Sequence, residues 1–226
     1  MFNNKKKDFL AVEEGSEPVI SIITNDFDDG DVYIDEKDLR DELPILPLRN
    51  TVIFPGTSLP ISVARTKSLK LIKSLNRKRG KFVGLICQKD ADNDDPELND
   101  LYEVGVIGEV IRVIELPDNE NVTVIFQGKK RFRLKDLVQT EPFIKGTYEI
   151  KDCIPVDKAD MEYKALLDSI RDLAFQMLRM YGEPPKELIQ RLKSEAASSI
   201  LVNYICTNLP ISGPEKHSML EIEDEI

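Results

Sequence analysis

The spacing of apolar residues changes once along this chain, near Asp157, and this change limits the possible folds more than any other feature. Residues 43–150 carry short apolar, β-branched runs separated by Gly, Pro and acidic turns, a pattern typical of strands joined by hairpins. In residues 157–226 the apolar side chains recur every three or four positions, as on one face of a helix. We therefore predict an α+β protein, with a β-rich part at 43–150 and a helical bundle at 157–226.

The β-rich part is expected to contain about six or seven strands in an antiparallel sheet that curls toward a barrel. The Pro-Gly pair at 55–56 supplies the fixed and the permissive torsions that a type II turn requires. One amphipathic helix interrupts the strands at 65–80, where Leu69, Ile72 and Leu75 form an apolar stripe opposite a row of lysines. The spacing thus predicts a sheet with one helix packed against it.

The helical part is divided by Gly and Pro into separate segments. Helices are expected at 160–181, 185–192, 197–209 and from 214 onward. The last helix still has an apolar residue in phase at Ile226 and shows no C-cap, so we interpret it as truncated inside that helix. Met219, Leu220 and Ile222 would then lack their normal cover, and we expect weak self-association through these side chains.

The net charge of −10 is concentrated at the start of the chain. Residues 1–42 hold thirteen acidic and five basic residues, whereas the remaining residues hold 28 and 26. We interpret residues 1–42 as a flexible acidic arm, because few large apolar groups there could offset the entropy lost on ordering. The nearly neutral remainder predicts no clustered basic surface, so nucleic acid is not expected as a partner.

Targeting and redox signals are also absent from the sequence. The N-terminus has no apolar signal-peptide core, and the three cysteines, at 87, 153 and 206, lie too far apart for a disulfide pattern or a zinc site. The uncharged stretch 196–214 contains Ser, Asn and Pro, which hydrocarbon disfavours, so we expect a buried helix there and no membrane span. These features predict a cytoplasmic protein without a metal site.

No catalytic constellation is recognisable. His217 is the only histidine, which excludes His-based triads and HExxH metal sites. Neither Gly-Lys pair, at 80–81 or at 128–129, has the preceding glycine or the following Ser or Thr of a P-loop. The run GKKRFR at 128–133 is the best nucleic-acid candidate, but we favour an edge strand protected by charge.

Several stretches, in this order along one chain, resemble the N-terminal domain of the Lon protease family. They are LPILPLRNTVIFPG at 43–56, LPISVARTKSLKLI at 59–72, NDLYEVGVIGEVIRVIELPDNENVTVIFQGKKRFRL at 99–134, EPPKELI at 183–189 and the uncharged helix at 196–210. The resemblance covers residues 43–226 and leaves the acidic arm outside the shared pattern.

The resemblance implies a PUA-like β-fold joined to an α-helical bundle. It also implies a parent enzyme that is a cytoplasmic homohexamer with an AAA+ ATPase, which binds ATP and Mg²⁺, and a Ser–Lys protease. In that family the N-terminal domain selects unfolded or damaged proteins and supports assembly. This chain would therefore bind polypeptides and other subunits, with no cofactor and no catalytic residue of its own.

Two pairs of residues are candidates for contact with substrate polypeptide. Ile53 and Phe54 are large apolar residues beside a turn, where surface loops usually lie. Arg65 and Lys67 place positive charge in the first turn of a helix, where the helix dipole disfavours it, and such local conflicts are frequent at functional sites. We predict a shallow apolar patch with a cationic rim at these residues.

Two alternatives remain open at this point. A free-standing Lon-N-like protein would bind polypeptides without a motor, and a PUA-like RNA-binding domain would bind with a steep dependence on salt. An independent enzyme is disfavoured by the missing motifs.

We expect this chain to hydrolyse neither ATP nor protein, because it lacks a P-loop and a marked nucleophile. The measurement is phosphate release and casein cleavage by a pure sample free of full-length enzyme. Turnover of either substrate would contradict this expectation.

Overall fold

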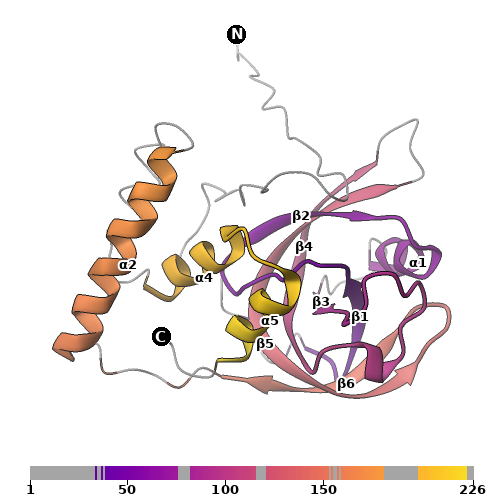
Figure 1. Cartoon of the computed structure of the whole chain (residues 1–226). Helices are drawn as coiled ribbons and strands as arrows, with labels where there is room; N and C mark the ends of the chain where they lie inside the picture. Colours follow the sequence, from indigo (N-terminus) through magenta and orange to yellow (C-terminus); the bar gives the residue numbers. More distant parts are fainter. Residues whose placement is uncertain are drawn as a thin grey trace, which may run out of the picture.

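The computed structural model describes residues 34, 37, 39–75, 82–115, 121–152, 154, 157, 159–180 and 198–222. The strands are β1 (Glu42–Leu48), β2 (Ser58–Val63), β3 (Phe82–Cys87), β4 (Val104–Glu115), β5 (Val122–Gln139) and β6 (Lys145–Lys151). The helices are α1 (Thr66–Leu75), the short 3₁₀ helix η3 (Leu98–Asp100), α2 (Met161–Met180), α4 (Ser198–Asn208) and α5 (Gly213–Glu221) (Figure 1). The helix expected at 185–192, the end of the helix expected at 65–80 and most of the acidic arm lie outside the described residues.

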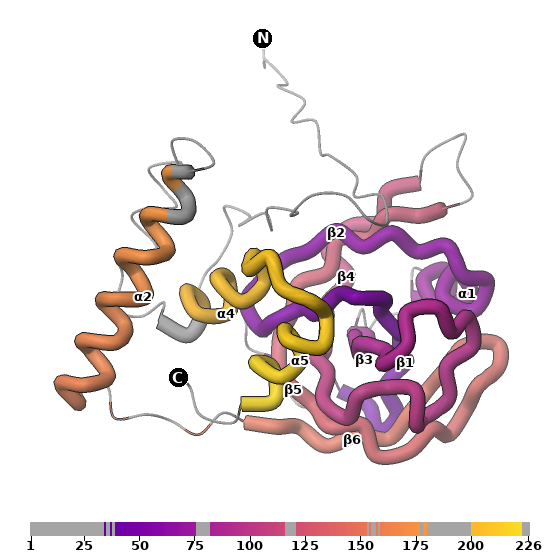
Figure 2. The backbone as a smooth tube through the Cα atoms, in the orientation of Figure 1, coloured from indigo at the N-terminus to yellow at the C-terminus, as the bar shows by residue number. Residues whose placement is uncertain are grey.

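The six strands form one sheet in the order β2-β5-β4-β3-β1-β6, and β5 also pairs with β6. This extra pairing closes β5, β4, β3, β1 and β6 into a ring around a common centre (Figure 2). It is possible because β5 is long: its first part pairs with β2 and its last part with β6. The predicted α+β class is confirmed.

One pairing departs from the antiparallel sheet that the sequence predicts. β1 and β3 run parallel, with Ile45 opposite Gly84, whereas the other pairs are antiparallel. The connection between β1 and β3 contains β2 and α1, so it is long enough to return the chain in the same direction. The helix in this connection also covers the sheet, because Leu71, Ile72 and Leu75 of α1 are buried.

Side chains alternate between two buried clusters. Leu46 and Leu48 of β1 belong to a first cluster beneath α1, whereas Leu43 and Ile45 belong to a second cluster around Phe132. Successive residues of a strand point to opposite faces, so a single strand contributes to both. Ile34, from the segment before β1, also joins the second cluster.

A close backbone approach holds the loop between β1 and β2. Gly56, in a turn with φ of 76°, donates its N–H to Gly128 O at 2.8 Å, and Gly128 donates its N–H to Thr57 O at 2.8 Å. The positive φ fits the expected type II turn. This approach leaves no room for a side chain at residue 128, and it positions Phe54 inside the first cluster.

Of the described helices in the C-terminal part, α4 contacts both others, and α5 also contacts the sheet. α2 packs against α4, whereas α5 contacts α4 and strand β4. Figure 1 shows α4 and α5 between α2 and the sheet. α5 ends at Glu221, and Ile222 is extended with ψ of 123°, so the expectation that this helix continues in phase through Ile222 is wrong. A bundle spanning 157–226 stays a prediction.

The imidazole of His217 joins α5 to the sheet. It is 1% exposed, and its ring stacks on Tyr102 with centroids 3.9 Å apart. Its Nε2 lies 3.0 Å from the carbonyl oxygen of Val104 and its Nδ1 lies 3.7 Å from a carboxylate oxygen of Glu221. Because the carbonyl can only accept, Nε2 carries the proton in the neutral ring. Burial lowers the pKa of His217, although the carbonyl, and then Glu221, oppose this effect while Lys89 adds to it.

We expect Gly128→Ala to lower the free energy of unfolding by about 1–3 kcal/mol, as overpacking of a tight core does. A Cβ at residue 128 would lie 2.3 Å from the backbone oxygen of Phe54 and 2.9 Å from Cγ2 of Ile53. Urea unfolding measures the change. Ser62→Ala, at an exposed position of β2, is the control and should change the value by less than about 0.5 kcal/mol. An unchanged urea midpoint for Gly128→Ala would contradict the prediction, because the loop would then accommodate the added Cβ without loss of stability.

We expect stability to fall as the pH is lowered from about 7 to 5, because the unfolded imidazole, with a pKa near 6.5, binds a proton before the folded one does. The stability given by neutral His217 is thus present above the unfolded pKa and decreases below it. Thermal unfolding across this range measures the slope. His217→Gln keeps a donor for Val104 but cannot titrate, so its slope should be flatter; equal slopes in the two proteins would contradict the prediction.

Candidate functional site

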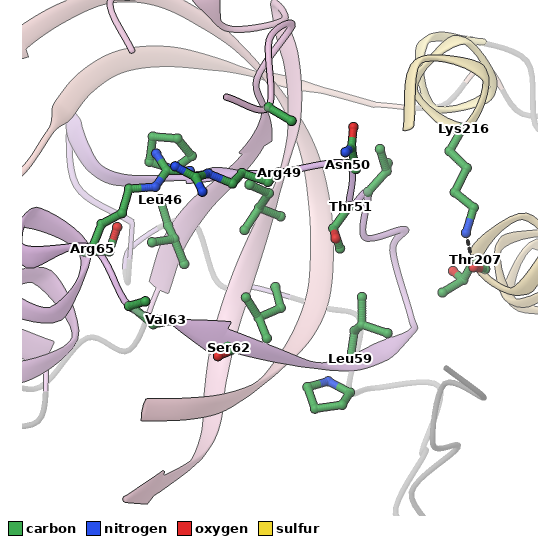
Figure 3. Close-up of a pocket in the computed structure, with 18 of the residues that line it drawn as sticks. Leu46, Arg49, Asn50, Thr51, Leu59, Ser62, Val63, Arg65, Thr207 and Lys216 are labelled. Carbon is green, nitrogen blue, oxygen red and sulfur yellow. Dashed lines mark hydrogen bonds between the residues drawn. The ribbon is translucent and has the colours of Figure 1, made fainter. Parts of the chain in front are cut away.

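A cleft of about 660 Å³ opens beside β2. Its walls come from separate parts of the chain: the end of β1 and residues 49–52, strand β2, the start of α1, and the segment from the end of α4 into α5 (Figure 3). A volume in this range is typical of ligand sites, which lie in concavities with an apolar lining and a few polar groups. We therefore take this cleft as the candidate functional site.

The floor of the cleft is the first apolar cluster itself. Leu46, Leu59 and Val63 line the cleft and are buried members of that cluster. Above them, Leu209 and Ile211 are half-buried, so they offer apolar surface to a ligand. A floor that is also core is held rigidly by close packing, and it can bind apolar side chains without rearranging.

Cations lie at both ends of the cleft. Arg49 and Arg65 line the part of the cleft near Leu46 and Val63, and Lys216 projects from α5 at the other end (Figure 3). Asp92 is the one carboxylate among the lining residues. The cleft is therefore cationic, although the protein as a whole carries a net charge of −10. Carboxylates are the complementary ligand groups.

Hydrogen bonds hold these cations in position. Arg65 donates to Oε1 of Gln88 at 2.6 Å, and Gln88 donates to two backbone carbonyls of the loop that follows β3. Arg49 pairs with Asp94 of the same loop. Lys216 donates from Nζ to Thr207 O at 2.6 Å, and partial burial lowers its pKa. Their positions are thus set before any ligand enters.

The structure separates the four residues that the sequence proposed for polypeptide binding. Ile53 and Phe54 are 2% and 1% exposed and belong to the core, so their assignment to a surface patch is wrong. Arg65 does line the cleft. Lys67 lies outside it and is paired with Asp95 at 2.6 Å and Glu141 at 3.1 Å, whose hydrogen bonds raise its pKa. These carboxylates offset the conflict with the helix dipole that had suggested a function.

Sequence reasoning missed most of the cleft. Arg49 follows an apolar strand, and Lys216 lies in the first turns of α5, so neither has a local pattern that marks a site. They come within one cleft because α4 lies against the loop before β2 and α5 packs against α4 and β4. Asn203 of α4 donates to Pro55 O at 3.0 Å, which ties that helix to the loop before β2. Pro60 was the one usable signal, because proline inside a strand is typical of an edge strand.

The apolar residues proposed for self-association are mostly covered. Leu220 is 2% exposed, and Met219 packs against the first cluster. Ile222 is 52% exposed, and its carbonyl oxygen accepts a hydrogen bond from Arg131. The expected stripe of uncovered apolar side chains is therefore wrong for Met219 and Leu220, because α5 packs against β4 and the first cluster.

The cations of the basic run at 128–133 lie beside carboxylates. This run lies in β5, which pairs on both sides, so the expectation of an edge strand is wrong. Lys129 is buried and lies 3.1 Å from Glu109, and Lys130 lies 3.6 Å from Asp152. The alternation of cations with carboxylates leaves no contiguous basic patch along this part of the strand.

Within the residues that the structure describes, no three His, Cys, Asp or Glu side chains are grouped closely enough to hold a metal ion. Among the described helices, none is long and apolar enough to cross a membrane.

Comparison with known proteins gives consistent matches. The family model for the ATP-dependent protease La (LON) substrate-binding domain matches residues 42–225. A Lon protease of Parabacteroides distasonis is 41% identical over 206 residues, which are 91% of this chain and 25% of that protein. A Lon protease of Porphyromonas gingivalis is 39% identical over 207 residues, which are 91% of this chain and 24% of that protein. This chain thus spans about a quarter of the length of these relatives.

Solved structures share the fold at lower identity. A Lon N-terminal domain protein from Xanthomonas campestris aligns with a TM-score of 0.55 and 18% identity, over 81% of this chain and 92% of that one. The N-terminal domain of the Mycobacterium avium complex Lon protease aligns with a TM-score of 0.59 and 19% identity, over 81% and 91%. These likenesses concern the fold alone. The family match over residues 42–225 decides the assignment: the chain belongs to the family of LON substrate-binding domains.

Proposed function

We propose that this chain recognises protein substrates for a Lon-type ATP-dependent protease, and that the cleft beside β2 holds stretches of unfolded polypeptide. The observation that carries the proposal is the combination of a rigid apolar floor with cations at both ends. Unfolded segments expose apolar side chains and scattered carboxylates, which this combination complements. Binding would be loose, because a shallow cleft covers few residues at a time.

We further propose that catalysis belongs to the rest of a longer protein. The names of the relatives and the quarter of their length that this chain spans support this division. The remainder would supply the AAA+ ATPase, with ATP and Mg²⁺, and the Ser–Lys protease, in a cytoplasmic homohexamer whose assembly this domain supports. The closed ring of strands supports a PUA-like barrel as the β part.

The role of the cleft in polypeptide binding can be tested by reversing the charge of one cationic side chain at each end. We expect Arg65→Glu with Lys216→Glu to raise the Kd for a reduced, unfolded protein about tenfold and to weaken the dependence of binding on salt. Fluorescence anisotropy with labelled, carboxymethylated α-lactalbumin at two ionic strengths gives both quantities. Thermal unfolding checks that the variant is folded.

Lys70→Glu with Lys73→Glu is the matched control. It changes the net charge equally but on the exposed face of α1. We expect its Kd to stay near that of the unaltered protein. If both double variants weaken binding equally, overall charge controls the interaction and the cleft is not the site.

A further inference from the structure

We propose that the open edge of β2 binds substrate by strand addition, so that an extended peptide pairs with the backbone of Pro60 and Ser62 inside the cleft. This inference rests on the proposed function and specifies how the polypeptide is held. Among the strands that the structure describes, β2 is the one that pairs with a single neighbour, β5. Its other edge runs along the cleft, since residues 59–63 are among those lining it.

The register shows which backbone groups face the cleft. Gly128 of β5 donates to Thr57 O, and residues of β2 and β5 are paired in order from Ser58–Gln127 to Val63–Val122. In an antiparallel pair the hydrogen-bonded residues alternate along each strand. The N–H and C=O groups of residues 59, 61 and 63 therefore point to β5. Those of residues 58, 60 and 62 point to the open side.

Pro60 fits this assignment. It has no N–H, so at a position bonded to β5 it would remove a bond of the ladder. At residue 60 its nitrogen faces the cleft, and β2 keeps its pairing with β5 intact. Within the cleft the open edge thus offers the N–H and C=O of Ser62 and the C=O of Pro60, whereas Ser58 is buried. An edge with so few donors discourages pairing along its whole length with another sheet but still accepts a short peptide.

The side chains around the open edge of β2 determine which kind of peptide fits the cleft. Leu59, Ile61 and Val63 place their side chains toward the core side of β2, so the floor that meets a bound strand is apolar. Arg49 and Arg65 lie at the Val63 end and Lys216 lies toward the Leu59 end (Figure 3). We infer an extended segment with alternating apolar side chains and a carboxylate near each end. Backbone pairing supplies affinity independent of sequence, and the cations add the preference for acidic flanks.

The first experiment tests the pairing from the ligand side. The probe is a capped peptide of about eight residues, matching β2 at about 3.3 Å per residue, that alternates Val and Thr between two Asp residues. Two derivatives carry N-methyl groups at alternate amides, one for each set of backbone N–H groups. Because one set would face β2, we expect one derivative to bind about tenfold more weakly than the parent peptide. The other derivative should lose less affinity than the first, so it is the matched control.

The second experiment removes a donor from the protein. Ser62→Pro deletes the N–H that faces the cleft without removing a bond to β5. We expect Ser62→Pro to weaken binding of the probe about tenfold. Lys70→Ala, on the exposed face of α1 outside the cleft, should leave binding unchanged. If Ser62→Pro does not fold, amide hydrogen exchange of the unaltered protein decides. The Ser62 amide should become slow to exchange on adding the probe, whereas those of residues 59 and 61 are slow already.

The outcomes separate strand addition from the function on which it rests. One outcome is that Arg65→Glu with Lys216→Glu weakens binding of the probe, while N-methylation, Ser62→Pro and the exchange rate of the Ser62 amide show no effect. In that case strand addition is wrong and the cleft remains a polypeptide site. If unfolded protein binds and the probe does not, strand addition is again overturned. If neither binds, both proposals fail.

Discussion

The pairing of β5 with β6 is the constraint on which the rest of this structure depends. A single strand of 18 residues, Val122–Gln139, first pairs with β2 and then with β6, while β4 pairs with it from Val122 to Arg133. This closes the ring and creates the inner cluster around Phe132. It also leaves β2 outside the ring, attached through β5, so that its second edge stays open beside the cleft. The pairing of β5 with β6 therefore explains both the closed ring of strands and the position of β2 at its outside.

The loop between β3 and β4 organises the cationic side of the cleft. Its carboxylates pair with Arg49 and Lys67, and its backbone accepts hydrogen bonds from the side chain of Gln88. Gln88 in turn orients Arg65. Without these partners, three neighbouring cations around the end of β1 and the start of α1 would repel one another. The acidic loop thus makes a fixed cationic rim possible on an acidic protein.

Local patterns predicted which segments become strands or helices, since alternation and helical spacing are properties of neighbouring residues. Which side chains are buried was harder to predict, because burial depends on residues far away in the chain. Ile53 and Phe54 are core residues because Gly128 approaches their backbone, and Leu220 is buried because β4 lies beneath α5. The cleft could not be predicted for the same reason: its walls meet only in three dimensions. Pro60 was expected in a turn and lies in edge strand β2, and nothing in the sequence indicates which side of that strand is open.

Adjacent residues of α5 serve different parts of the molecule. Lys216 faces the cleft, whereas His217 is anchored on Val104 and Tyr102 in the sheet. Tension applied to the chain after Ile222 would load the Arg131 contact first and the His217 anchor next, before it reached the Lys216 wall. These two contacts would therefore resist such a pull before the wall of the cleft at Lys216 moved.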